Sequence, residues 1–128
     1  MKKKIIYTKQ GPPPAGAYSQ AVKYGNLVFT AQLGPLDPNT GKLLAPGDIV
    51  EQTKITIQNL EKVLKEAGSS LEKVLKVTAY IDVNQWQAFN DTYAENFPNK
   101  GLPARSIMGI NENNEMLVAL DIIAYCED

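Results

Sequence analysis

The strand-like segments of this chain carry more apolar surface than its helical segments can cover, and this mismatch limits the folds it can adopt. Residues 116–125 read Met-Leu-Val-Ala-Leu-Asp-Ile-Ile-Ala-Tyr, so both faces of a strand here would be largely apolar. Only two segments have helical periodicity, and two helices can cover only one face of a six-stranded sheet. The other face is expected to lie against another subunit, which predicts an oligomer.

The first predicted helix is marked at both ends. Asp48 can cap its N-terminus, with Glu51 three residues later as in a capping box, and Gly68 suits its C-terminal cap. Its apolar stripe is expected to comprise Val50, Thr53, Ile57, Leu60, Leu64 and Ala67. The second helix is expected to begin at Asn84 and to end before Pro98. Its inward-facing residues are expected to be Trp86, Phe89, Tyr93 and Phe97.

Six segments have the composition of strands. They are residues 4–8, 17–22, 27–32, 74–83, 104–110 and 116–125. Tyr24-Gly25-Asn26 separates the second from the third as a hairpin turn would. No linker or repeat divides the sequence, so residues 1–128 are expected to form a single domain. The order βββαβαββ predicts an α+β fold in which both helices pack on one face of one six-stranded sheet.

Composition excludes several classes of chemistry and of partner. The chain of 128 residues has no histidine, which excludes Ser-His-Asp and Cys-His nucleophiles and His-ligated metal sites. Its balance of 13 basic against 14 acidic residues predicts neither a nucleic acid nor a membrane surface as a partner. The basic residues Lys2–Lys4 precede too short an apolar run for a signal peptide, and no run is long enough to span a membrane. We therefore expect a cytoplasmic protein.

Arg105 is a charged residue within a strand-like pattern. Alternation places it on the same face of the predicted strand as Ile107. Its guanidinium group is permanently charged, and its planar fork suits a carboxylate. Two interpretations follow: a structural pair with an acidic side chain, or an arginine that binds a ligand.

Three further polar side chains leave similar alternatives open. Asp121 is the single acid of the last predicted strand, where a carboxylate needs a partner. A symmetric hairpin about Asn113 would place it opposite Arg105 as a structural ion pair. Asn90 lies within the apolar stripe of the second helix, where its amide either ties the helix to a strand or reaches a pocket. Tyr18 is expected to pack against the sheet.

An ordered series of motifs over essentially the whole chain resembles the Rid (reactive intermediate deaminase, RidA/YjgF-like) family. The most specific motif is Pro-Ala-Arg-Ser at residues 103–106. The others are Gly-Ala-Tyr-Ser-Gln-Ala-Val at 16–22, Leu-Asp-Pro-Asn-Thr-Gly at 36–41, Gln52-Thr53 with Asn59-Leu60, Ala-Gly-Ser-Ser-Leu-Glu-Lys-Val at 67–74, and Phe-Asn-Asp-Thr-Tyr at 89–93. The resemblance implies a chorismate-mutase-like fold with a mixed sheet, and a homotrimer with clefts between subunits. It also implies a hydrolase that converts 2-aminoacrylate-type enamines and imines to 2-keto acids and ammonia without a metal or cofactor.

The resemblance further implies roles for individual residues. Arg105 would bind the substrate carboxylate, with Asn90 lining or supporting the cleft. Asp121 stands where active members usually carry a glutamate that holds the attacking water, and Tyr18 matches another cleft position. The remaining substrate-binding positions are Ala31, Gln32 and Ile107.

Three positions depart from the family pattern. Ala31-Gln32-Leu33 replaces the usual Ser-Gly-Gln, Ile107 replaces a frequent cysteine, and Asp121 is one methylene shorter than glutamate. We predict a deaminase of the 2-iminobutanoate/2-iminopropanoate type. The departures motivate an alternative, a non-catalytic trimer that binds a small carboxylate such as a keto acid. A ribonuclease or translation inhibitor is a further alternative, which the near-neutral charge and the lack of a basic patch disfavour.

Overall fold

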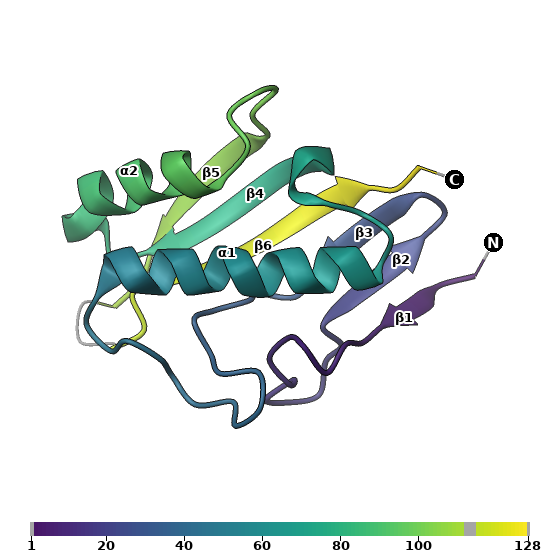
Figure 1. Ribbon diagram of the computed structural model, residues 1–128, viewed down its shortest axis with the longest axis horizontal. Helices are drawn as coiled ribbons and strands as arrows, with labels where there is room; N and C mark the ends of the chain where they lie inside the picture. Colours follow the sequence, from purple (N-terminus) through teal and green to yellow (C-terminus); the bar gives the residue numbers. More distant parts are fainter. Residues whose placement is uncertain (1, 112–114, 128) are drawn as a thin grey trace.

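The computed structural model describes residues 2–111 and 115–127 of the chain (Figure 1). The strands are β1 (Lys4–Ile6), β2 (Ala21–Tyr24), β3 (Leu27–Thr30), β4 (Val74–Ile81), β5 (Ala104–Gly109) and β6 (Val118–Tyr125). The helices are α1 (Ile49–Glu66) and α2 (Trp86–Asn96), and the short 3-10 helices η1 (Leu71–Lys73) and η2 (Val83–Gln85) precede β4 and α2. The predicted order βββαβαββ is therefore confirmed.

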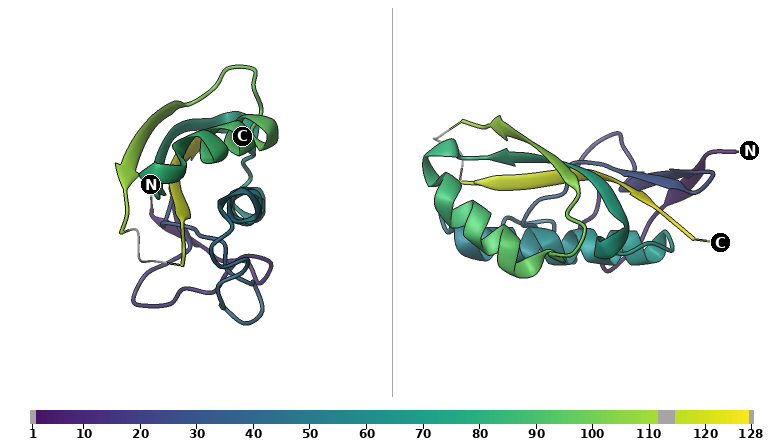
Figure 2. Two further views of the ribbon diagram at one scale, coloured as in Figure 1. Left: turned by 90° about the vertical axis from the view of Figure 1, so that its left-hand side faces the viewer. Right: turned by 90° about the horizontal axis from the view of Figure 1, so that it is seen from above.

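One six-stranded sheet has the strand order β1-β2-β3-β6-β4-β5. Strand β5 runs parallel to β4, and all other neighbours are antiparallel. Both helices cover one face of this sheet (Figure 2), which confirms the predicted α+β fold with a mixed sheet. Strands β5 and β6 both flank β4, so the hairpin that would pair Arg105 with Asp121 is not formed. Its expected centre, Asn113, lies outside the described residues.

The first helix begins and ends as predicted. Asp48 Oδ1 accepts a hydrogen bond from the N–H of Glu51 at 3.1 Å, and Gly68 has a positive φ of 83° just beyond the helix. The predicted stripe is wrong at Val50, which is 39% exposed, whereas Ile49 is buried. Because the helix starts at Ile49, that residue occupies the inward position of the first turn.

The second helix begins two residues later than predicted. Asp82 Oδ1 accepts from the N–H of Asn84 at 3.1 Å, which caps η2 and delays α2 until Trp86. Phe89, Tyr93 and Phe97 are buried as predicted, while Trp86 is 39% exposed. The buried rings follow one another along the helix, with Tyr93 and Phe97 stacked at 4.8 Å between centroids.

Buried amides hold the loops of the N-terminal half against the sheet and α1. Gln20 Oε1 accepts from the N–H of Thr8 at 2.7 Å, and its Nε2 donates to the carbonyl of Pro12 at 2.8 Å. Asn59 of α1 donates to the carbonyl of Gly34 at 3.0 Å. These bonds satisfy backbone groups that burial would otherwise leave without partners. Two of the motif residues therefore have structural roles.

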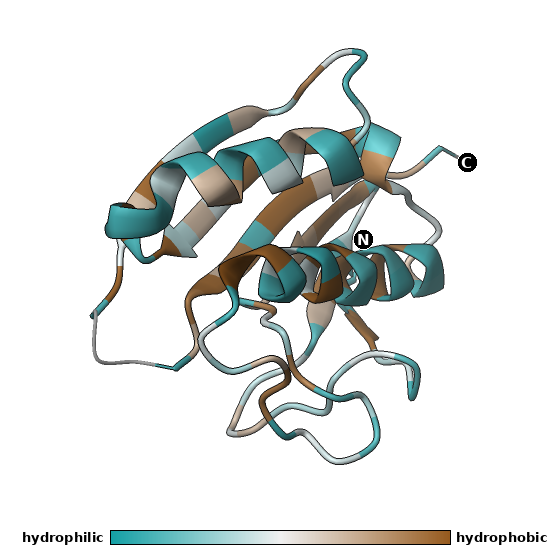
Figure 3. Cartoon of the chain, turned by 60° about the vertical axis from the view of Figure 1, so that its left-hand side comes forward, coloured by the Kyte–Doolittle hydropathy of each residue, from teal (hydrophilic) through white to brown (hydrophobic). Residues whose placement is uncertain are grey.

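The sheet face opposite the helices, called here the open face, carries exposed apolar side chains. On β3, Val28 is buried beneath the helices, whereas Leu27 and Phe29 point the other way and are 36% and 41% exposed. On β5, Met108 is 53% exposed, while its neighbour Ile107 packs against the core. Figure 3 shows hydrophobic residues along the strands, whereas both helices alternate between hydrophobic and hydrophilic residues. Contact of this face with another subunit remains a prediction.

Within the described part of the chain, no helix is both long enough and apolar enough to cross a bilayer. The cytoplasmic location and the single domain over residues 1–128 stay predictions.

Gln52→Leu is expected to lower the free energy of unfolding by about 2–4 kcal/mol. Gln52 Oε1 accepts from the N–H of Leu117 at 2.8 Å, and its Nε2 donates to the carbonyls of Glu115 at 2.9 Å and Ala45 at 3.0 Å. Leucine would leave these backbone groups without partners. Urea unfolding measures the change, and Gln58→Leu on the exposed side of the same helix is the control. Equal losses for the two variants would contradict a specific role for Gln52.

Candidate functional site

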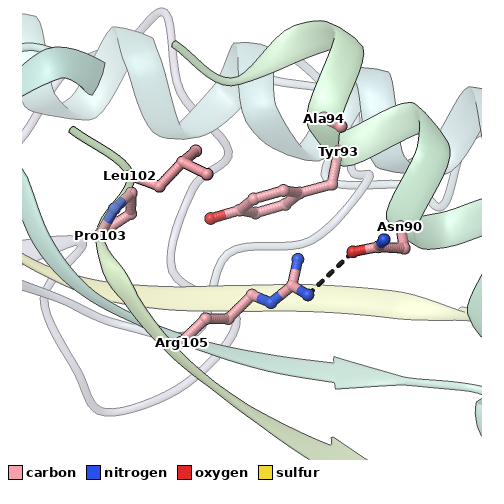
Figure 4. A pocket seen from close by; sticks show the side chains of 6 residues that line it. All are labelled: Asn90, Tyr93, Ala94, Leu102, Pro103 and Arg105. Atoms are coloured by element: carbon pink, nitrogen blue, oxygen red, sulfur yellow. Dashed lines mark hydrogen bonds between the residues drawn. The ribbon is translucent and has the colours of Figure 1, made fainter. Parts of the chain in front are cut away.

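A pocket of about 360 Å³ opens between α2 and β5 (Figure 4). Helix α2 contributes three of its lining residues, and the segment entering β5 contributes the others. They are Asn90, Tyr93, Ala94, Leu102, Pro103 and Arg105. The pocket thus combines a cation and two further polar side chains with a short apolar wall.

The pairing of β5 with β4 directs Arg105 into this pocket. Arg105 lies opposite Val77 in the parallel register, and Val77 is fully buried on the helix-covered face. Arg105 therefore points toward α2, where its Nη2 donates to Asn90 Oδ1 at 2.8 Å. Asn90 thus ties the helix to the strand and also lines the pocket, so both predicted alternatives hold. Ile107 lies on the same face of β5 as Arg105, opposite Ala79.

Aromatic rings of α2 hold the guanidinium group of Arg105. Its central carbon lies 4.7 Å from the ring centroid of Tyr93, 5.2 Å from that of Trp86 and 5.8 Å from that of Phe89. Such cation–π contacts contribute about 0.5–2 kcal/mol each. Within residues 2–111 and 115–127, the partners of the guanidinium are neutral, so the alternative of a structural pair with an acid is not formed among these residues. The described residues thus surround the positive charge with neutral groups, an arrangement that suits an anionic ligand.

Tyr93 adds a buried hydroxyl group beside Arg105. This hydroxyl has no hydrogen-bond partner among the described residues. Burial raises the pKa of Tyr93 to about 12, and Arg105 opposes that rise through its positive charge and through N–H groups that lie near the hydroxyl without the geometry of a hydrogen bond. The hydroxyl is therefore protonated at neutral pH. The helical periodicity predicts Tyr93 only as a core residue, although its position three residues after Asn90 places both on one side of the helix.

Asp121 lies on the opposite face of the sheet from Arg105. In the register of β4, Arg105 faces Val77 whereas Asp121 faces Thr78, and consecutive side chains of a strand point to opposite faces. Asp121 has the partner that its position requires, because the Tyr80 hydroxyl donates to its Oδ2 at 2.6 Å. Within one chain, Arg105 and Asp121, to which the resemblance assigns the central roles, therefore lie on opposite faces of the sheet.

Two of the other predicted site residues lie beside Asp121. Residues 30–33 run alongside residues 120–122, through a bridge at one end and a side-chain hydrogen bond at the other. This pairing brings Ala31 and Gln32 next to Asp121. The N–H of Ala31 is engaged, since it donates to the carbonyl oxygen of Gln20 at 2.8 Å.

Tyr18 lies in the loop before β2 rather than in a strand. It is 49% exposed, and its hydroxyl accepts from the N–H of Ala15 at 3.0 Å. The expectation that it packs on the sheet is wrong, because the predicted strand 17–22 begins only at Ala21.

Apart from Tyr18, the candidate site residues and their neighbours thus form two groups. We call Arg105, Asn90, Tyr93 and Ile107 the arginine group, and Asp121, Tyr80, Ala31 and Gln32 the aspartate group. No cluster of three or more carboxylate or thiol side chains suited to a metal ion occurs in the described residues.

Comparison with known proteins assigns the chain to a family. The family model described as Endoribonuclease L-PSP matches residues 8–126. A RutC family protein of Pyrococcus abyssi is 43% identical over 129 residues, which cover 99% of this chain and 100% of that relative. The chain belongs to the Rid family. This result confirms the resemblance seen in the sequence.

Two further Rid proteins are informative about function. The chloroplastic Reactive Intermediate Deaminase A of Arabidopsis thaliana is 36% identical over 107 residues, covering 83% of this chain and 56% of that protein. The crystal structure of E. coli TdcF with bound serine has a TM-score of 0.83 at 28% identity and covers 97% of this chain and 99% of that one. Membership in this family supports a deaminase function in general terms.

The free energy of unfolding is expected to fall between pH 10 and pH 12 through Tyr93. Its folded pKa of about 12 lies above the ordinary value of 10.0, so the unfolded tyrosine loses its proton first as the pH rises. The stabilising contribution is complete below pH 10 and decreases by up to about 3 kcal/mol toward pH 12. Urea unfolding at pH 8, 10 and 11 measures this contribution as the difference in the free energy of unfolding between the wild type and Tyr93→Phe. A constant difference over this range would contradict the assignment.

Proposed function

We propose that this Rid protein hydrolyses 2-aminoacrylate-type enamines and imines to 2-keto acids and ammonia. The observation that carries the proposal is Arg105, whose guanidinium group is held at a pocket by neutral partners and has no acidic partner among residues 2–111 and 115–127. A 2-imino acid offers the carboxylate that such a group binds. The deaminase named among the relatives supports the same class of reaction.

Arg105 would bind the substrate carboxylate with both arms of its planar fork. Each charge-assisted hydrogen bond of this kind contributes about 1.5–3 kcal/mol. Asn90 Oδ1 accepts from one of the two N–H groups of Arg105 Nη2, which fixes the plane of the fork and leaves the other N–H of Nη2 to the carboxylate. Because the rings of α2 also restrict the guanidinium, little side-chain freedom is lost when the ligand binds.

A homotrimer with clefts between subunits would bring the two groups of site residues together. Arg105 and Asp121 lie on opposite faces of one chain, so they cannot act on the same small substrate within that chain. In the proposed assembly, Arg105 of one subunit meets Asp121 of the partner subunit across the cleft. The exposed Leu27 and Phe29 of the open face supply apolar area for such contacts.

The chemistry requires orientation of a water molecule and transfer of protons. An enamine first takes up a proton at carbon and loses one from nitrogen to become the imine. Asp121 would hold a water that adds to the imine carbon, giving a carbinolamine. A proton then moves to the nitrogen, the C–N bond breaks, and ammonia leaves as the C=O bond forms. Tyr18 is proposed to line the cleft near these proton transfers.

A second candidate function is binding of a small carboxylate without turnover. The side chain of Asp121 is one methylene shorter than glutamate, and its Oδ2 already accepts a hydrogen bond from Tyr80. Ala31 also lacks the hydroxyl that the family usually carries at this position. The serine bound to E. coli TdcF supports small-molecule binding within the family. A ribonuclease activity is disfavoured by the net charge of −1.

The wild-type protein is expected to accelerate ammonia release from 2-aminoacrylate generated in situ above the uncatalysed rate. Arg105→Ala should lower kcat/KM at least about 100-fold, because two charge-assisted hydrogen bonds are lost. Arg105→Lys keeps the charge but loses the planar fork, so its kcat/KM should lie between those of the wild type and Arg105→Ala. Lys100→Ala removes an exposed positive charge and is the matched control. Background rates for the wild type, with a keto acid still bound, would favour the second candidate.

Asn90→Asp is expected to weaken binding of 2-oxobutanoate at least about 10-fold, because the new carboxylate would neutralise Arg105 from 2.8 Å away. The folded protein should not lose stability, since an ion pair replaces a neutral hydrogen bond. Isothermal titration calorimetry measures the affinity, and thermal unfolding measures the stability. Asn99→Asp, the same change at an exposed position, serves as the control. Unchanged affinity would show that Arg105 does not bind the ligand.

A further inference from the structure

Tyr80 and Asp121 form a close contact on the open face that no sequence motif indicates. Asp121 of β6 lies directly opposite Thr78 of β4, and Tyr80 is the next residue along β4 on the same face. A side chain as long as tyrosine reaches such a diagonal neighbour. The Tyr80 hydroxyl donates to Asp121 Oδ2 at 2.6 Å, a length typical of a charge-assisted O–H···O⁻ bond.

We propose that Tyr80 is a positioning residue of the deaminase reaction, which fixes the Asp121 carboxylate and leaves Oδ1 to hold the attacking water. The proposal rests on the proposed function. An aspartate side chain has two rotatable bonds, and on a half-exposed strand position both stay variable unless a partner restricts them. The hydrogen bond to Tyr80 restricts both bonds, because it fixes the position of the terminal oxygen.

The shorter side chain of Asp121 makes this restriction consequential. A carboxylate one methylene short of glutamate lies closer to its own strand, so a given water is within reach over fewer orientations. Tyr80 uses one of the two lone pairs of Oδ2, so Oδ1, with both of its lone pairs, is the better placed oxygen to accept a hydrogen bond from water. The same contact raises the pKa of Tyr80, chiefly through the hydrogen bond to Asp121, so the phenol stays protonated and continues to donate.

The test compares steady-state kinetics of ammonia release for the wild type, Tyr80→Phe, Asp121→Asn and the double variant. Tyr80→Phe removes one oxygen and is expected to lower kcat about 10- to 100-fold, as misplacement of a reacting group does. KM should stay within about 2-fold, because Arg105 and its partners are unchanged. In the Asp121→Asn background the same substitution should have no further effect, because Tyr80 acts through Asp121.

Tyr125→Phe is the matched control, because Tyr125 lies on the same face of β6 as Asp121 and loses the same hydroxyl. It should retain the wild-type kcat. Full activity of Tyr80→Phe, or an equal loss in the Asp121→Asn background, would overturn the inference. A loss expressed in KM alone would do the same, since it would assign Tyr80 to binding.

A second measurement separates this inference from the proposed function. With ¹³C-labelled aspartate, the carboxyl resonance of Asp121 can be assigned by its absence in Asp121→Asn. It should shift and broaden in Tyr80→Phe but not in Tyr125→Phe. An inactive wild type with that shift present would overturn the proposed function while upholding the restraint on the carboxylate. An unchanged resonance would overturn the restraint itself, whatever the rate.

Discussion

The parallel pairing of β5 with β4 determines where the charge of this protein lies. Helix α2 leaves the end of β4 and returns the chain to the start of β5, so the helix passes over the strand that it leads into. Arg105 thereby lies beneath the rings of that same helix and beside Asn90. If β5 paired with β6 instead, Arg105 would face another set of side chains. The pocket, the orientation of the fork and the neutral partners of the guanidinium among the described residues all depend on this one strand pairing.

Local signals in the sequence were enough to predict the elements and their order. Asp48 and Gly68 mark the ends of α1 because capping depends on residues within a few positions of each other. Alternation also placed Arg105 and Ile107 on one face of their strand. The errors arose where the first residue of an element decides which way its side chains point. Because α1 starts at Ile49, Val50 points to solvent. The strand expected from residue 17 starts at Ala21, which leaves Tyr18 in a loop.

The candidate site could be predicted only in part, for a physical reason. A sequence pattern indicates which face of its own strand a side chain occupies, but not which strand lies next to it. The partners of Arg105 and Asp121 depend on contacts 15 and 41 residues away along the chain. Family resemblance supplied candidate roles for both residues, whereas the strand register showed that they lie on opposite faces. The unsatisfied hydroxyl of Tyr93 was likewise invisible, because burial without a partner is a property of packing.

The opposed faces of Arg105 and Asp121 have a consequence for how damage would spread through the proposed assembly. In a closed ring of identical chains, each chain offers its arginine group to one cleft and its aspartate group to another. A chain defective in both groups would therefore disable two clefts, although it is a single member of the ring. In mixed assemblies of intact and defective chains, the fraction of activity lost would therefore exceed the fraction of chains that are defective. A minority of damaged copies would also inactivate clefts to which intact copies contribute.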